Sequence, residues 1–138
     1  MMSKKLAYFL ILIVVSCTQN HADNTAAQVP VIHKDMSSEV YKTVAVLSIE
    51  GMMCEEGCGG KIQSELRALQ GVKVTELDFV DQRQSNFIRV EYDPSVLSEL
   101  KIFDCVHQIA DGKYKVTSAE IIHYKGLQSS QHGGALPV

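Results

Sequence analysis

The hydrophobic pattern between residues 41 and 124 changes its period several times, and this succession restricts the fold more than any other feature. Apolar side chains at every second position predict strands, whereas a spacing of three to four residues predicts helices. Ile62, Leu66 and Leu69 share one helical face, and Gly71 follows as a stop signal. The pattern predicts, in chain order, a strand at 41–50, a helix at 58–69, strands at 72–80 and 87–93, a helix opened by Asp93-Pro94-Ser95 and ended by Gly112, and a strand at 114–124.

The second predicted helix carries its own apolar stripe, formed by Ile102, Cys105, Val106 and Ile109. Because each helix connects strands in a split βαβ arrangement with right-handed crossovers, both helices should lie on one face of the sheet. We therefore expect an α+β fold, the ferredoxin-like βαββαβ sandwich with a four-stranded antiparallel sheet. In this interpretation Cys105 is a small core residue, and His107 lies at the surface or at the boundary of the core.

The N-terminus has the layout of a secretory signal. Lys4 and Lys5 precede an unbroken apolar run at 6–15, which is short compared with the ~20 residues that a membrane-spanning helix needs. An uncleaved membrane anchor is the alternative. The run ends in "VVSC", which resembles the bacterial lipobox, whose cysteine is lipidated and becomes the first mature residue. We expect residues 1–17 to be a lipoprotein signal peptide, with Cys17 as the lipidation site that holds the protein to the bacterial cell envelope on its extracytoplasmic or periplasmic side.

Polar segments flank the patterned region on both sides. Residues 18–40 show little hydrophobic periodicity and are expected to form a flexible tether. Residues 125–138 are rich in Gly, Ser and Gln and are expected to form a disordered tail. The histidines in these segments are interpreted as solvated linker residues, because a metal site needs several ligands held together: His21, His33 and His132.

The stretch "GMMCEEGCGG" at 51–60 places Cys54 and Cys58 between the first strand and the first helix. A thiolate rather than a thiol binds metal, and the positive end of a helix lowers the pKa of a nearby thiol. Cys58 is therefore well placed to ionise, while Cys54 on the preceding loop can swing to meet it. Two thiolates suit soft ions. They also leave the coordination sphere open, unlike the four ligands of a structural zinc site.

At this point the chain resembles the heavy-metal-associated domain, a family that includes copper chaperones and the periplasmic mercury-binding protein. The resemblance rests on the element order and on "GMMC", "LQGV" and "VEYDP", and it implies that residues 41–124 form such a domain. The family motif is Gly-Met-Thr-Cys-x-x-Cys. Here Met53 replaces threonine, and the second cysteine arrives one residue late, which makes a variant CxxxC motif. Neighbouring glycines can accommodate the extra residue.

The resemblance implies that Cys54 and Cys58 bind the metal and that a residue before the last strand, Lys113 or Tyr114, lies close to it. Met53 is either a weak additional thioether contact or a solvent-facing loop residue. Glu55 and Glu56 are either favourable charge at a helix start or harder groups that shift the preference toward divalent ions.

These features predict an envelope-anchored protein that sequesters or hands over a heavy-metal ion. Cu(I) is the first choice, and Zn(II), Cd(II) and Hg(II) are the other candidates. A metal-transporting ATPase or efflux component would be the partner. The alternative is an extracytoplasmic module in which Cys54 and Cys58 form a redox-active or structural disulfide. No catalytic constellation is visible, so we expect no enzyme, and the formal charge of −3 argues against nucleic-acid binding.

Overall fold

The computed structural model describes residues 28–126 of the chain. This part contains five strands, two α-helices, and two short turns of π- and 3₁₀-helix. In chain order they are β1 (Val31–Ser38), β2 (Lys42–Glu50), η2 (Glu55–Gly59), α1 (Gly60–Arg67), β3 (Val72–Asp78), β4 (Ser85–Tyr92), α2 (Glu99–Gln108), η3 (Ile109–Gly112) and β5 (Lys115–Gly126). Neither α-helix of residues 28–126 is long and apolar enough to cross a membrane.

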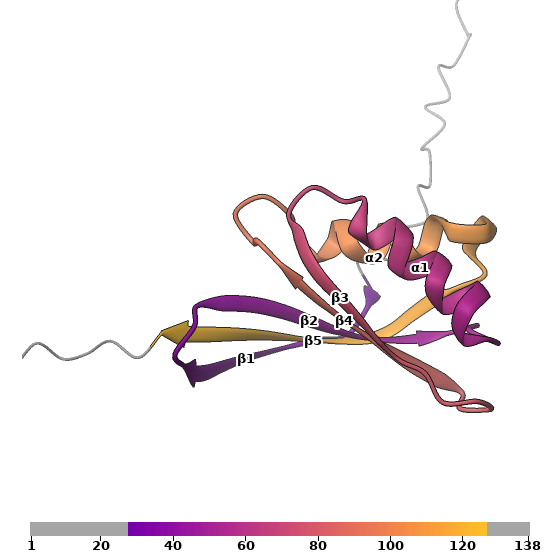
Figure 1. The fold of residues 1–138 in the computed structure, drawn as a ribbon, viewed down its shortest axis with the longest axis horizontal. Coiled ribbons are helices and arrows are strands. Elements are labelled where there is room, and N and C mark those ends of the chain that lie inside the picture. Colours follow the sequence, from indigo (N-terminus) through magenta and orange to yellow (C-terminus); the bar gives the residue numbers. More distant parts are fainter. Residues whose placement is uncertain (1–27, 127–138) are drawn as a thin grey trace, which may run out of the picture.

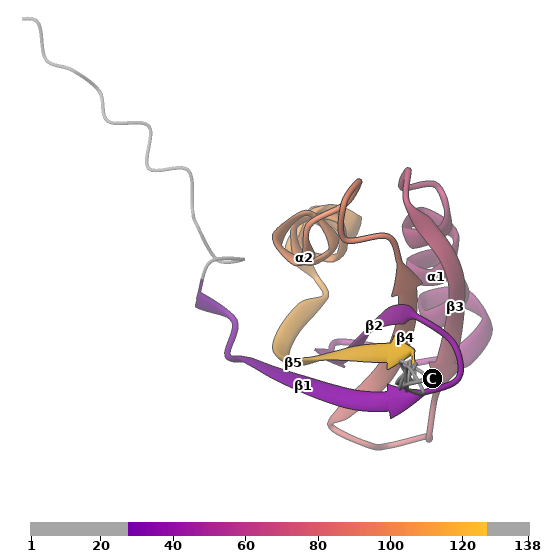
Figure 2. The same cartoon turned by 90° about the vertical axis from the view of Figure 1, so that its left-hand side faces the viewer.

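The strands form one sheet in the order β1-β5-β2-β4-β3, and both α-helices lie on the same face of it (Figures 1 and 2). The four strands β2 to β5 pair in antiparallel fashion, in the chain order that the sequence predicts. The α+β class and the two helices are thus confirmed. The prediction of a four-stranded, wholly antiparallel sheet is wrong, because β1 adds a fifth strand that runs parallel to β5.

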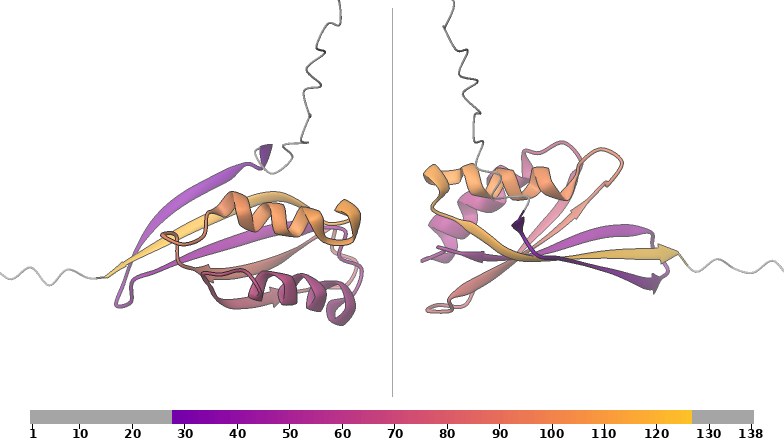
Figure 3. Two further views of the ribbon diagram at one scale, coloured as in Figure 1. Left: turned by 90° about the horizontal axis from the view of Figure 1, so that it is seen from above. Right: turned by 180° about the vertical axis from the view of Figure 1, so that it is seen from behind.

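Strand β1 lies within the segment that we expected to be a flexible tether. Its eight residues are all exposed or only half-buried, so it has no alternation of apolar and polar side chains for a sequence pattern to reveal. Backbone pairing with β5 and two ion pairs, Lys34–Glu120 and Lys125–Asp35, hold it instead. The long β5 extends to Gly126, so residues 125 and 126 belong to the sheet and not to a tail. Figure 3 shows β1 along the edge of the sheet, beside β5.

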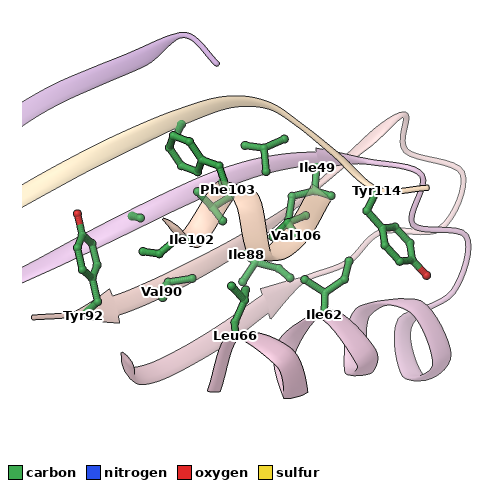
Figure 4. Close-up of a cluster of buried hydrophobic side chains, with 14 of the residues drawn as sticks. Ile49, Ile62, Leu66, Ile88, Val90, Tyr92, Ile102, Phe103, Val106 and Tyr114 are labelled. Carbon is green, nitrogen blue, oxygen red and sulfur yellow. The ribbon is translucent and has the colours of Figure 1, made fainter. Parts of the chain in front are cut away.

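The core lies between the helices and the sheet, as the periodicity predicts. Helix α1 contributes the fully buried Ile62 and Leu66, and α2 contributes Ile102, Phe103 and Val106. Each such side chain stabilises the fold by about 1.5–3 kcal/mol through removal of apolar surface from water. Figure 4 shows these side chains meeting the strand residues, with the Tyr114 hydroxyl directed away from the aliphatic cluster. The remaining members on the strands include Ala45, Leu47, Ile49, Ile88, Val90, Tyr92, Val116 and Ile121.

The two α-helices begin later than the sequence pattern suggests. Asp93 does not open α2; its carboxylate accepts hydrogen bonds from the backbone N–H and hydroxyl of Ser95, which makes a turn. The N-cap of α2 is Ser98, whose hydroxyl accepts from the backbone N–H of Lys101 at 3.4 Å. The start of α1 is displaced to Gly60 because the residues before it form the π turn η2.

Candidate metal centre

The loop after β2 is anchored by a close backbone contact at Gly51. Its φ of +92° lies in a region that favours glycine, and a Cβ there would come within 2.5 Å of the carbonyl oxygen of Lys113. The Gly51 backbone therefore rests directly on the segment that precedes β5. The next residue, Met52, is 7% exposed and packs in the core, whereas Met53 is 76% exposed. This contact brings together two segments that are about 60 residues apart in sequence.

The extra residue of the CxxxC motif is absorbed by the π turn η2. Cys54 is its extended N-cap residue, and its carbonyl accepts from the backbone N–H of Gly59 at 3.2 Å, the i to i+5 bond of a π-helix. Two glycines allow this turn to form. A Cβ on Gly57 would lie 3.1 Å from the Cys54 sulfur, and a Cβ on Gly59 would lie 2.4 Å from a methyl group of Leu77. Of the three glycines expected to accommodate the longer spacing, Gly57 and Gly59 do so by leaving room for neighbouring atoms, whereas Gly60 has ordinary helical angles and open space around it.

The π turn brings the two predicted ligands together as free thiols. The Cys54 thiol donates to Cys58 Sγ at 3.1 Å, and the backbone N–H of Cys58 donates to Cys54 Sγ at 3.3 Å. Cys54 is exposed, and Cys58 is half-buried. With a metal–sulfur distance of about 2.3 Å, an ion in linear coordination needs its two sulfurs about 4.6 Å apart. The sulfurs must therefore separate by about 1.5 Å, which the exposed side chain of Cys54 can supply by rotation.

The surroundings favour the thiolate form of Cys58. The hydrogen bond from Cys54, followed by those from the Met53 backbone and the Tyr114 hydroxyl, lowers the pKa of Cys58 to about 7, although burial acts in the opposite direction. Burial and the neighbouring Cys58 and Cys54 raise the pKa of Tyr114 to about 12. Tyr114 consequently remains a protonated hydroxyl at neutral pH, able to donate to the thiolate. This arrangement favours a nucleophilic thiolate at Cys58 without a positively charged side chain beside it.

The other residues that the sequence suggests for the metal site differ in how close they lie to the thiol pair. Tyr114 is 5% exposed and contacts Cys58, whereas the exposed Lys113 extends along its ring, with Nζ 5.9 Å from the ring centroid. Met53 faces solvent. Cys17 lies outside the described residues. Glu55 and Glu56 are exposed in the first turn of η2.

Two further residues fall where the sequence places them. Cys105 is half-buried against the core, and burial raises the pKa of its thiol, which disfavours its thiolate form. His107 is also half-buried, and its Nε2 accepts from the backbone N–H of Val116 at 3.0 Å. The His107 hydrogen bond ties α2 to β5, and the Cys105 side chain contributes to packing against the core.

The contact of Gly51 with the Lys113 carbonyl was not predicted. The glycine itself is visible in the sequence, but the partner is a backbone atom far along the chain, and no side-chain pattern identifies it. The same holds for Leu77, whose methyl group requires glycine at position 59.

Within residues 28–126 no three His, Cys, Asp or Glu side chains form a group that could hold a metal ion. The thiol pair of this region therefore offers two ligands, which leaves further coordination positions open to water or to a partner. Comparisons of the chain with family models, with curated proteins and with solved structures found no match.

Proposed function

We propose that this protein binds one soft metal ion, Cu(I) before others, through Cys54 and Cys58, and that it sequesters the ion or hands it to another protein. The observation that carries the proposal is the pair of free thiols 3.1 Å apart at an exposed turn, one of them close to a tyrosine hydroxyl. The ion is cargo rather than a resident cofactor. The ferredoxin-like arrangement that we infer for β2 to β5 with α1 and α2 agrees with the resemblance to heavy-metal-associated domains.

The ligand set supports a soft ion of low coordination number. Thiolates select Cu(I), and two of them complete a linear site for Cu(I) or Hg(II). Zn(II) and Cd(II) would need further ligands, because Zn(II) in closed protein sites takes four. Glu55 and Glu56 carry the carboxylates nearest to the two cysteines in sequence, and carboxylates are harder ligands than thiolates. Zn(II) and Cd(II) are therefore the alternative cargo.

The exposure of the site supports a role in transfer. Cys54 is exposed, and Cys58 is half-buried behind it, so an incoming thiolate reaches the ion from the side of Cys54. A third sulfur can then bind before one of the first two leaves, which keeps the ion coordinated throughout. A metal-transporting ATPase or an efflux component is the partner that we propose. The protein would act as a binding protein rather than as an enzyme, and nucleic acid would not be a partner.

The proposed location depends on Cys17. Acyl chains on this residue would hold the protein to a bacterial membrane, with the domain on the extracytoplasmic or periplasmic side. Mass spectrometry of the membrane fraction tests this part of the proposal. The Cys17→Ser variant should lose both the acyl mass and the membrane association, and a variant that stays acylated would contradict it.

A disulfide between Cys54 and Cys58 is the second candidate, because the same 3.1 Å separation also suits oxidation. The bond would close only a small loop, so its effect on stability should be small. In an oxidising compartment part of the population should carry it. The two functions differ in their response to reduction. In a sample shown to carry the disulfide, a carrier should take up metal only after reduction, and equal uptake before and after thorough reduction of that sample would exclude ligation by these thiols.

A Cu(I) competition titration against a chromophoric chelator tests the metal site. The reduced protein should take up one Cu(I), and Cys54→Ser or Cys58→Ser should weaken binding by two or more orders of magnitude, since one thiolate cannot chelate. Cys105→Ser is the matched control, because it removes a thiol of α2 that packs against the core and lies outside the π turn. If the double variant Cys54→Ser, Cys58→Ser kept wild-type affinity, the disulfide interpretation would replace the metal site.

A further inference from the structure

Strand β1 brings two histidines together at a place remote from the thiol pair. His33 on β1 and His123 on β5 have parallel rings, with centroids 5.9 Å apart and an interplanar angle of 7°. The register pairs His33 with Ile121 and His123 with Asp35, so both rings and the Asp35 carboxylate lie on the same face of neighbouring strands. His33 is exposed to solvent, as the sequence predicts, but it lies on strand β1 and not in a linker.

The His123 ring is oriented by a buried hydroxyl. Thr43 Oγ1 lies 3.3 Å from His123 Nδ1, and the Thr43 residue is only 2% exposed. A histidine that binds a metal through one nitrogen usually donates a hydrogen bond from the other, which fixes both its tautomer and its direction. With the proton on Nδ1 directed at Thr43, the lone pair of Nε2 is free to bind an ion.

We propose that His33 and His123 form a second metal site, which takes a borderline divalent transition-metal ion such as Cu(II) through two imidazole nitrogens. Imidazole suits Cu(II), Ni(II) and Zn(II), and Cu(II) stands highest in affinity among them. Metal–nitrogen distances of about 2.0–2.1 Å require the two nitrogens to come within about 3–4 Å. Rotation of the exposed His33 ring supplies this approach, and water completes the coordination.

The neighbouring charges modulate this site. Asp35 lies beside the pair, but its carboxylate accepts from Lys125 Nζ at 2.8 Å, and the same lysine, followed by the charge of His123, keeps the pKa of Asp35 low. Asp35 is therefore a nearby negative charge rather than a ligand in the present arrangement. Removal of the Lys125 ammonium would free the carboxylate to approach the ion.

The two metal sites cannot share one ion. Thr43 lies near the start of β2 and the thiol pair follows its end, and seven residues of strand span roughly 23 Å. In Figure 1 the helices cover one part of the sheet, and the paired ends of β1, β2 and β5 extend beyond them. His123 belongs to β5 and pairs with Thr43 near the start of β2. The histidine site is therefore independent of the proposed function of Cys54 and Cys58.

Titration with Cu(II), followed by the paramagnetic broadening of amide resonances, tests the proposal. The full chain is used with Cys54→Ser and Cys58→Ser, so that the thiol pair neither binds nor reduces the ion, and failure at one site is not confused with failure at the other. Broadening by the first equivalent of Cu(II) should centre on residues around 33 and 123. His33→Gln and His123→Gln should each weaken binding by about tenfold or more, the scale seen when a metal site loses part of its shell.

Two lysine variants provide a matched pair. Lys125→Gln should tighten Cu(II) binding severalfold, because it releases Asp35 on the face of the histidines. Lys34→Gln removes an equal charge and a similar ion pair, Lys34–Glu120 at 2.9 Å, but on the face of the sheet opposite the histidines. It should therefore change the affinity for Cu(II) little. Equal affinity in the wild-type and both histidine variants, broadening centred elsewhere, or equal effects of the two lysine variants would overturn the proposal.

Discussion

Replacement of Gly51 by alanine should destabilise the fold and disturb the thiol site together. The backbone φ of +92° costs an L-residue roughly 1–2 kcal/mol. The new Cβ would also lie 2.5 Å from the Lys113 carbonyl oxygen, a backbone atom that cannot rotate away, and forced overpacking of this kind costs about 1–3 kcal/mol. The free energy of unfolding should fall by about 2–5 kcal/mol in total.

The assay is urea unfolding of the reduced protein, combined with the rate of Cys58 alkylation at pH 7. Relief of the clash displaces the segment of Lys113 and Tyr114, so the Tyr114 hydroxyl should leave Cys58 and alkylation should slow. Gly60→Ala is the control, because its helical position has open space around the added Cβ. Alanine there should stabilise the protein by about 0.5–1 kcal/mol. A Gly51→Ala variant within about 0.5 kcal/mol of the wild type, the range of neutral surface changes, would refute the reasoning.

Three further predictions concern the same region. Folding lowers the pKa of Cys58 from 9.0 to about 7, so its ionisation contributes stability that is complete above pH 9 and is lost as the pH falls through about 7. The alkylation rate of the metal-free, reduced protein should therefore rise with a midpoint near pH 7, and a midpoint near pH 9 would contradict the arrangement. Tyr114→Phe keeps the buried ring but removes the hydroxyl, so the pKa of Cys58 should rise and alkylation at pH 7 should slow, whereas an unchanged rate would show that the hydroxyl is not a donor to Cys58. Gly59→Ala places a Cβ 2.4 Å from Leu77, and thermal unfolding should show the fold destabilised by about 1–3 kcal/mol. Leu77→Ala should reduce this loss of stability in a double-mutant cycle, whereas strictly additive effects of the two substitutions would exclude the contact.

The helices and strands that could be predicted are those whose buried apolar residues recur at a regular spacing in the sequence. Ile62 and Leu66 on α1, and Ile88 and Val90 on β4, occur at the spacings that their elements require, and all are fully buried. The apolar faces then determine how the helices lie against the sheet. Strand β1 was not predicted because it pairs through backbone groups while its side chains are exposed or half-buried. Its sequence therefore shows no alternation of apolar and polar residues.

The candidate thiol site could be predicted as a pair of residues but not as a geometry. The spacing of Cys54 and Cys58 identifies two soft ligands before a helix. The π turn depends on long-range contacts that allow only glycine, such as that of Gly59 with Leu77. The histidine pair was missed for a related reason, since His33 and His123 are 90 residues apart and only the parallel pairing of β1 with β5 brings them side by side.

X-ray absorption spectroscopy of the reduced protein loaded with one equivalent of Cu(I) tests the central claim most directly. Ligation by the π-turn thiols predicts two sulfur neighbours around the copper. These neighbours should be lost in the Cys54→Ser, Cys58→Ser double variant and kept in Cys105→Ser. Copper surrounded by nitrogen or oxygen, or a sulfur shell that persists in the double variant, would contradict it.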